Sequence, residues 1–231
     1  MVGDDSSSLG RISSGIAANT LVGQTIDFVY EQLPSWRDDP DRESVMAEER
    51  LNLQLCKYLN SVGRNDFPMV NFNPEEHQAP RRKVDISATP IEKLQIKARV
   101  FTKYDPFLVL EGKRLPTPGT GRQQEYLTGR AARSGGIQRF RLGLHGNLLT
   151  KAAMIGYIQR DEGSDWHVEI NGWIDQELTN PTDPTCTWSA DDRLGELQPN
   201  SLARSSRCGS SHQRTASTTD QVDLDHLWIE M

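Results

Sequence analysis

The clearest pattern of hydrophobic and polar positions lies in residues 45–62. Apolar residues recur there at steps of three or four, as on one face of an α-helix; they are Val45, Leu51, Leu55, Leu59 and Val62. We expect Ser44 to cap this helix. Glu48 shares the apolar side, whereas Glu49 is turned about 100° away around the axis.

A looser helical spacing predicts a first helix in residues 17–33, after a Ser- and Gly-rich start in residues 1–16 that we expect to be mobile. Helical periods return in part of residues 123–145, chiefly in the segment GIQRFRLGLHG, and in residues 166–178. The last of these helices places Trp166, Ile170, Trp173, Ile174 and Leu178 on one face.

Strands are predicted between these helices. Residues 106–116 begin with four consecutive apolar residues and are bracketed by prolines, a pattern typical of a strand buried on both faces. Residues 91–102 alternate apolar and polar side chains, with a helix as the alternative. The other predicted strands are 67–73, 82–88, 152–159, 202–214 and 222–231.

This order of elements predicts an α/β protein with a central mixed sheet flanked by helices. We divide the chain into an N-terminal polar segment and helix (1–44), a core (45–178), and a C-terminal loop and strand pair (179–231) that extends the same domain. No internal repeat is visible.

The charge is distributed unevenly, although the net charge is −6. Residues 81–160 carry 16 Lys and Arg against 5 Asp and Glu, whereas residues 1–80 carry 6 against 13 and residues 161–231 carry 4 against 14. A basic central third suits a phosphate-binding surface, because Lys and Arg displace the counterions condensed on nucleic acid. The alternative is a basic face that pairs with the acidic ends.

Several classes of protein are disfavoured. No run approaches the ~18 apolar residues of a membrane helix, and the start MVGDDSSSLG lacks the features of a signal peptide, so we expect a cytoplasmic protein. Three widely spaced cysteines indicate reduced thiols rather than disulfides or a zinc site. The motifs of P-loop proteins, serine hydrolases and zinc proteases are absent, and GTGR (119–122) lacks the P-loop spacing.

Candidate chemistry lies on two of the predicted strands. Asp85 is flanked by Val84 and Ile86, and Glu111 ends an apolar run, so both carboxylates are expected in buried positions that require a cation. Lys113 shares a strand face with Glu111, since the two are two residues apart. Carboxylates are the ligands that Mg²⁺ prefers. The alternative is a solvated strand end, with Asp85 in a turn.

A helix with Glu48, then VDI with Asp85, then LVLEGKRL with Glu111 and Lys113 resembles the PD-(D/E)xK nuclease superfamily, whose α-β-β-β-α-β core matches residues 45–159. One departure is that the proline of the motif does not precede Asp85 directly, since Pro80 lies five residues upstream. The segments EGKRLP, EYLTG, GGIQRF and AAMIGYIQ also resemble restriction-like nucleases of prokaryotic defence loci.

The resemblance implies a restriction-endonuclease-like fold and a Mg²⁺-dependent endodeoxyribonuclease, with Mn²⁺ as a substitute, acting against phage or foreign DNA. Asp85 and Glu111 would bind the metal with the Gly112 carbonyl. Lys113 would act on the water or the transition state, and Glu48, or less readily Glu49, would support the metal or a water. The alternative for Glu48 is an ordinary capping-box role at the start of its helix. RNA as substrate, exonuclease action, and a homodimer or a helicase or ATPase partner stay open.

Nucleic-acid contacts are expected from five residues: Arg139, Gln138, Arg82, Lys83 and Arg114. Arg81 belongs to the same basic run as Arg82, for which a solvated surface is the alternative. His145, His212 and His226 lack metal-ligand spacing. We expect His212, Arg214 and His226 to form a structural polar cluster, and Tyr126 to belong to the core.

Two rival functions remain. One is a nuclease fold that serves as a binding or effector subunit and is active only with a partner. The other is an interaction protein without a nucleic-acid role.

Overall fold

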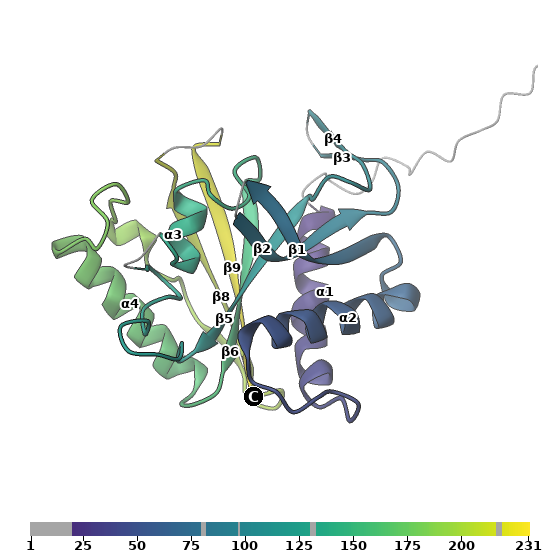
Figure 1. Cartoon of the computed structure of the whole chain (residues 1–231), viewed down its shortest axis with the longest axis horizontal. Coiled ribbons are helices and arrows are strands. Elements are labelled where there is room, and N and C mark those ends of the chain that lie inside the picture. The colour runs from purple at the N-terminus through teal and green to yellow at the C-terminus, as the bar shows by residue number, and fades with distance from the viewer. Residues whose placement is uncertain (1–19, 80–81, 97, 130–132, 216–218) are drawn as a thin grey trace, which may run out of the picture.

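The computed structural model describes residues 20–79, 82–96, 98–129, 133–215 and 219–231 (Figure 1). The expectations for residues 1–16, Pro80 and Arg81 lie outside these ranges. A mixed seven-stranded sheet forms the centre of the molecule, with strand order β1-β2-β5-β6-β9-β8-β7. Its strands are β1 (Val70–Ala79), β2 (Arg82–Pro90), β5 (Leu108–Leu115), β6 (Lys151–Ile158), β7 (Gln198–Asn200), β8 (Ser205–Gln213) and β9 (Gln221–Glu230).

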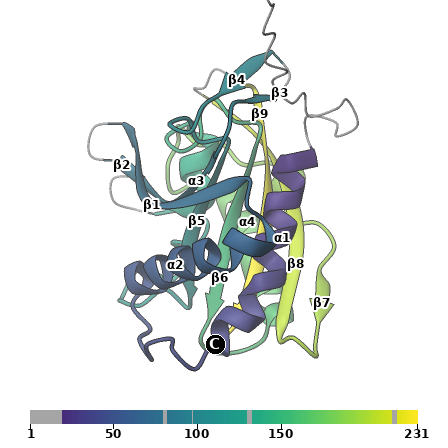
Figure 2. The same ribbon diagram turned by 90° about the vertical axis from the view of Figure 1, so that its right-hand side faces the viewer.

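Helices cover both faces of this sheet (Figures 1 and 2). On one face lie α1 (Thr20–Arg37) and α2 (Glu48–Asp66); on the other lie α3 (Gly136–Arg141) and α4 (Gly163–Thr179). The predicted α/β class and the mixed sheet between helices are therefore confirmed. Within the described ranges, no helix is both long and apolar enough to span a membrane.

The sheet has parallel strands at its centre and antiparallel strands beside them. The parallel strands β5, β6 and β9 lie side by side at the centre, with β2 and β8 antiparallel on either side of them. Residues Leu108–Leu110 are fully buried, as the apolar run predicts. Residues 91–102 form neither a long strand nor a helix but a separate two-stranded hairpin, β3 (Leu94–Ile96) with β4 (Arg99–Phe101).

Some boundaries differ from the predictions. The helix α2 begins at Glu48 with Ala47 as its N-cap and no side-chain cap, so the prediction of Ser44 as the cap is wrong. In the described part of residues 123–145, only Gly136–Arg141 form a helix, and Gly143 at positive φ turns the chain soon after it. Leu178 on α4 is 37 % exposed rather than on the buried face.

The predicted C-terminal strand pair forms, since β8 and β9 are antiparallel neighbours. However, β9 lies in the interior of the sheet, parallel to β6, and not at an edge. Residues His226, Leu227, Trp228 and Ile229 are all buried, as a strand covered on both faces requires.

Candidate functional site

The candidate site lies where β2 and β5 separate. Their pairing joins Ile86–Ala88 with Leu108–Leu110 and ends there, whereas β5 continues beside β6 to Leu115. Beyond this pairing, two carboxylates accept hydrogen bonds from N–H groups of β5. Asp85 Oδ2 accepts from the Gly112 N–H at 2.8 Å, and Glu48 Oε2 accepts from the Arg114 N–H at 3.1 Å. The backbone of β5 thus holds both acids at this opening, because its N–H groups need partners.

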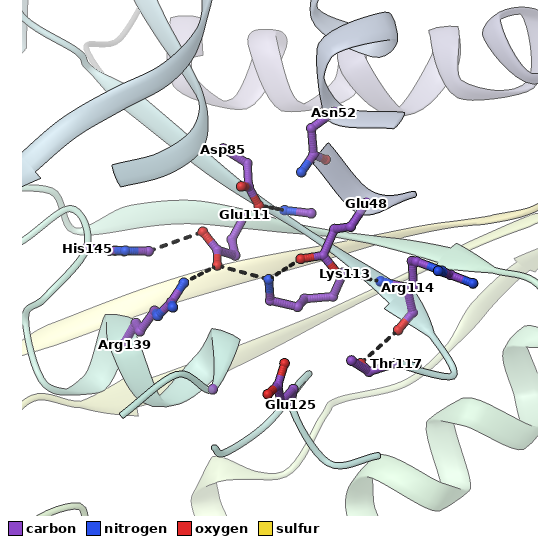
Figure 3. Close-up of polar contacts among 12 residues, drawn as sticks. Glu48, Asn52, Asp85, Glu111, Lys113, Arg114, Thr117, Glu125, Arg139 and His145 are labelled. Carbon is purple, nitrogen blue, oxygen red and sulfur yellow. Dashed lines mark hydrogen bonds and ion pairs between the residues drawn. The ribbon is translucent and has the colours of Figure 1, made fainter. Parts of the chain in front are cut away.

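Glu111 and Lys113 complete the group of predicted residues (Figure 3). The Lys113 ammonium lies between two carboxylates, with Nζ 2.6 Å from Glu48 Oε1 and 3.2 Å from Glu111 Oε1. Arg139 of α3 donates to the same Glu111 oxygen at 2.7 Å. The four residues predicted to be catalytic are therefore brought together from one helix and two strands.

The electrostatics of the site follow from burial and from a shortage of positive charge. Burial raises the pKa of Asp85 to about 8, and the neighbouring carboxylates of Glu111 and Glu48 add to this rise, although Lys113 opposes it. Burial also acts to raise the pKa of Glu111, but Lys113, His145 and Arg139 outweigh it and hold that pKa below its usual range. Asp85 is thus the carboxylate whose charge is least compensated.

Lys113 responds in the opposite sense. Burial alone would lower the pKa of its ammonium, but Glu111, Glu48 and Asp85 outweigh burial and raise that pKa. With its side chain only 7 % exposed, Lys113 is a buried cation held by three acids.

No spacing in the sequence marks His145 as part of this site. It is 1 % exposed, and its Nδ1 lies 3.3 Å from Glu111 Oε2. That contact does not have the geometry of a hydrogen bond, and neither atom has another hydrogen-bond partner. The Leu144 and His145 N–H groups both donate to the Arg139 carbonyl, at 2.8 and 3.3 Å, which keeps His145 beside Arg139.

Asn52 is a second residue that the sequence reading missed. It is buried on α2, one turn after Glu48, and its Oδ1 accepts a hydrogen bond from the Tyr157 hydroxyl at 2.7 Å. A Cβ added at Gly112 would lie 2.0 Å from Asn52 Oδ1, so the glycine between Glu111 and Lys113 allows α2 to pack closely on β5. The Asn52 Nδ2 is buried without a hydrogen-bond partner.

The Gly- and Pro-rich loop after β5 adds an exposed cation near the site. Arg122 is 54 % exposed and pairs with Glu125 at 2.6 Å. The hydrogen bond to Glu125 is the main reason that the pKa of Arg122 is raised, and the charge of Glu48 contributes as well. No motif marked Arg122, because its proximity to Glu48 depends on the path of the loop.

The residues predicted to contact nucleic acid lie in different environments. Gln138 is fully buried, and its Oε1 accepts from the Gly129 and Gly135 N–H groups. Its predicted contact with nucleic acid is therefore corrected to a structural role, in which its side chain joins Gly129 to Gly135. Arg139 joins the site and keeps 24 % of its side chain exposed. Lys83 is exposed and pairs with Glu75 at 2.8 Å.

The two remaining basic residues border the opening of the sheet. Arg114 is half-buried and its Nε donates to Gln159 Oε1 at 3.1 Å. Arg82 is half-buried at the start of β2, three residues before Asp85. Solvent reaches the site past Glu48 and Arg139, whose side chains are each 24 % exposed. Four surface cavities of about 240 to 480 Å³ are lined by other residues.

The donor set fits a divalent cation with few protein ligands. In the part of the chain that the structure describes, no group of three or more His, Cys, Asp or Glu side chains is placed to hold a metal. Magnesium commonly takes only one or two protein carboxylates and completes its shell with water and phosphate. Glu111 Oε2, buried and without a hydrogen-bond partner, and Asp85, whose charge is poorly compensated, are suitable oxygen ligands.

Comparisons with known proteins add no family assignment: no protein-family model, no curated protein and no solved structure matches this chain.

Proposed function

We propose that this chain is a metal-dependent nuclease that hydrolyses phosphodiester bonds of DNA at a PD-(D/E)xK-type site. The observation that carries the proposal is the convergence of Glu48, Asp85, Glu111 and Lys113 where β2 and β5 separate. The succession α2, β1, β2, β5, α3, β6 supports it, since it follows the α-β-β-β-α-β core of that superfamily with the β3–β4 hairpin inserted.

Asp85 and Glu111 would hold the divalent cation, with the Gly112 carbonyl as a further oxygen ligand. The Gly112 N–H points to Asp85, and the N–H and carbonyl of one strand residue point to the same side, which supports this role. The bound metal would supply a Lewis acid for the phosphoryl oxygen and a more acidic water.

Lys113 acts in this proposal as a cation rather than as a base. Its three acidic neighbours raise the pKa of the ammonium, so it keeps its proton at neutral pH. A buried ammonium beside the scissile phosphate stabilises the negative charge that builds up in the transition state. Of the two roles that the sequence left open, the ion pairs of Lys113 with Glu48 and Glu111 favour transition-state stabilisation.

Glu48 positions Lys113. One of its oxygens accepts from Nζ and the other from the Arg114 N–H, which fixes the carboxylate. Glu49 is exposed on the other side of the helix. Arg139 holds Glu111 and reaches solvent, so its guanidinium is placed to contact a substrate phosphate.

The experiment is a cleavage assay with the purified chain, Mg²⁺ or Mn²⁺, and four substrates: supercoiled plasmid, linear duplex, single-stranded DNA and RNA. Cleavage that is lost in Asp85→Asn and Lys113→Met supports the proposal. Glu48→Gln should reduce cleavage strongly, and the matched control Glu49→Gln should not. Cleavage that persists in Asp85→Asn would overturn the site. Absence of cleavage on every substrate, with either metal, would overturn the unassisted enzyme.

One observation favours a second candidate, a nucleic-acid-binding or effector subunit that is active only with a partner. Lys113 and Arg139 already pair with Glu111, so this acid is compensated without a metal. Salt-dependent DNA binding that survives Lys113→Ala, without cleavage, would support this candidate. A role in defence against phage would then be tested by plating efficiency in cells carrying the wild-type gene or Asp85→Asn.

A further inference from the structure

The β3–β4 hairpin stands apart from the main sheet. Its two strands pair with each other and belong to a sheet of their own, and the segment joins β2 to β5. In Figures 1 and 2 it lies at the top of the molecule, away from α2 and α4. Phe101 is buried, whereas the other residues of β3 and β4 are half-buried or exposed.

Three cations of the hairpin segment form no ion pair with a described residue. Lys93 and Lys103 are exposed and Arg99 is half-buried, and within the described residues none of the three forms an ion pair. The acid that follows, Asp105, is engaged by the Thr102 N–H and hydroxyl at 2.9 and 2.6 Å. Lys93 and Lys103 therefore present positive charge to solvent, unlike Lys83, which pairs with Glu75. The same segment also holds the exposed Glu92, and the charge of Asp105 interacts with Arg99.

Apolar side chains are exposed beside these cations. Tyr104 is 79 % exposed, Val100 54 % and Ile91 47 %. The Lys103 ammonium lies 5.1 Å from the centre of the Tyr104 ring. Cations that follow a phosphate backbone, together with an aromatic face on which a base stacks, are the two elements of single-strand recognition.

The position of the hairpin ties it to the candidate site. It emerges from β2 and β5, the two strands that carry Asp85 and Glu111. Ile91 lies six residues after Asp85, which places it at most about 20 Å away, since a strand rises roughly 3.3 Å per residue. One strand of duplex DNA covers that length in about six nucleotides at 3.4 Å each.

We propose that residues 91–96 and 98–105 form a nucleic-acid-binding arm that contacts the substrate about six or more nucleotides from the bond to be cut. Lys93, Arg99 and Lys103 contact phosphates, and Tyr104 stacks on a base that is not paired. The arm rests on the proposed function. It selects substrates that extend beyond the site and that have a single-stranded or frayed flank there.

Binding is measured without divalent metal, so that it does not depend on cleavage. Fluorescence anisotropy of labelled 30-nucleotide single strands and duplexes is compared between the full-length wild type and the variant Lys93→Ala/Arg99→Ala/Lys103→Ala. The control Lys57→Ala/Arg160→Ala/Arg193→Ala removes three exposed cations elsewhere, of which Arg160 and Arg193 form ion pairs. The arm variant should lower the salt dependence of single-strand binding by about two units of slope, at ~0.7 per phosphate contact; the control should not.

Tyr104→Ala and substrate length give two further readouts. Loss of one stacked base should weaken single-strand binding by about five-fold or more, and duplex binding less. Single strands of five nucleotides, too short to span the site and the arm, should bind the wild type and both arm variants equally. Equal losses of DNA affinity in the arm and control variants would overturn the arm. It would also be overturned if the arm variant bound anionic vesicles less well than the wild type but kept the wild-type affinity for DNA.

Failure of the arm and failure of the proposed function give different results. If the arm is wrong but the nuclease is right, the arm variants bind and cleave long substrates as the wild type does. If the nuclease is wrong but the arm is right, binding depends on the arm, and neither the wild type nor Asp85→Asn cleaves DNA with Mg²⁺ or Mn²⁺.

Discussion

The core of the molecule holds two polar clusters that meet the cost of burial differently. One is the carboxylate site around Glu111. The other is a chain of hydrogen bonds, each 2.7 or 2.8 Å long, that joins Trp228 Nε1, the Tyr126 hydroxyl, both nitrogens of His226, the Ser210 hydroxyl, both nitrogens of His212, and Asp192 Oδ1. We call it the closed chain.

The donors of the closed chain all run in one direction. The Trp228 indole can only donate, so the Tyr126 hydroxyl accepts from it; with Asp192 ionised and both histidines neutral, this hydroxyl donates to His226 Nδ1. His226 then donates from Nε2 to Ser210, which donates to His212 Nε2. His212 donates from Nδ1 to Asp192, whose carboxylate also pairs with Arg141. Each link from Trp228 to Asp192 is satisfied, although Nε and Nη1 of Arg141 are buried without a hydrogen-bond partner among the described residues.

The carboxylate site, in contrast, leaves buried atoms open. Glu111 Oε2, His145 Nδ1, Arg139 Nε and Asn52 Nδ2 have no hydrogen-bond partner. Buried polar groups in folded proteins are nearly always bonded, so such a concentration of open atoms indicates a place where a ligand completes the set. This difference supports our proposal that the carboxylate site binds a ligand, whereas the closed chain supports the fold.

The same comparison bears on Ser210. The distances from Ser210 to His212 and from His212 to Asp192, 2.7 and 2.8 Å, resemble those of a nucleophilic triad. However, the hydroxyl is also held by His226, and His212 and His226 are fully buried. We therefore interpret the arrangement as structural, in agreement with the sequence prediction for the two histidines.

Asp85→Asn should produce the largest effect that separates the two clusters. We expect loss of a metal ligand to reduce cleavage by roughly 10³-fold or more, the equivalent of several kcal/mol. The free energy of unfolding of the metal-free protein should be unchanged or higher, since burial disfavours the charged form of Asp85 and the amide keeps an acceptor for the Gly112 N–H. Cleavage assays and urea unfolding measure the two quantities, and a strongly destabilised but active variant would contradict the comparison.

Ser210→Ala should show the reverse pattern. It leaves buried nitrogens of His212 and His226 without their shared partner, at a cost of about 2–4 kcal/mol of stability. Cleavage at temperatures where the variant is folded should match that of the wild type. Ser211→Ala, on the exposed neighbouring residue, is the control. Labelling of wild-type Ser210 by a fluorophosphonate would show that its hydroxyl reacts as a nucleophile, and would contradict the structural role of the closed chain.

Local patterns predicted much of the fold and part of the site. The helical period distinguished Glu48 from Glu49, and the two-residue period of a strand put Glu111 and Lys113 together. These predictions hold because each depends on one element.

Other features depend on contacts between distant segments, which a single sequence does not encode locally. His145 reaches Glu111 through the turn after α3, and β9 enters the sheet between β6 and β8. Arg214 was expected to join His212 and His226 but instead donates to the Phe140 and Gly146 carbonyls at 3.0 and 2.8 Å. The alternation of side chains along β8 predicts the face on which Arg214 lies, but it does not predict which groups Arg214 contacts.

The pH dependence of stability offers a smaller and more selective test of the closed chain. Burial lowers the pKa of His226 to about 3, with His212 and His167 contributing. Because this pKa lies below the value of about 6.5 in the unfolded chain, the neutral ring stabilises the fold fully above pH 6.5. This stabilisation is lost as the pH falls from about 6.5 to about 3, at roughly 1.4 kcal/mol per pH unit.

His226→Gln removes this titration while keeping a side chain that can donate and accept. Between pH 6 and 4, the unfolding free energy of the wild type should therefore fall more steeply than that of the variant, by about 1.4 kcal/mol per pH unit. Asp192, whose pKa is lowered to about 2 because His212 and Arg141 outweigh burial, loses its contribution only below about pH 3.8, and it does so in both proteins. Parallel curves from pH 6 to 4 would mean that His226 binds a second proton in the folded state, which the one-directional chain does not allow.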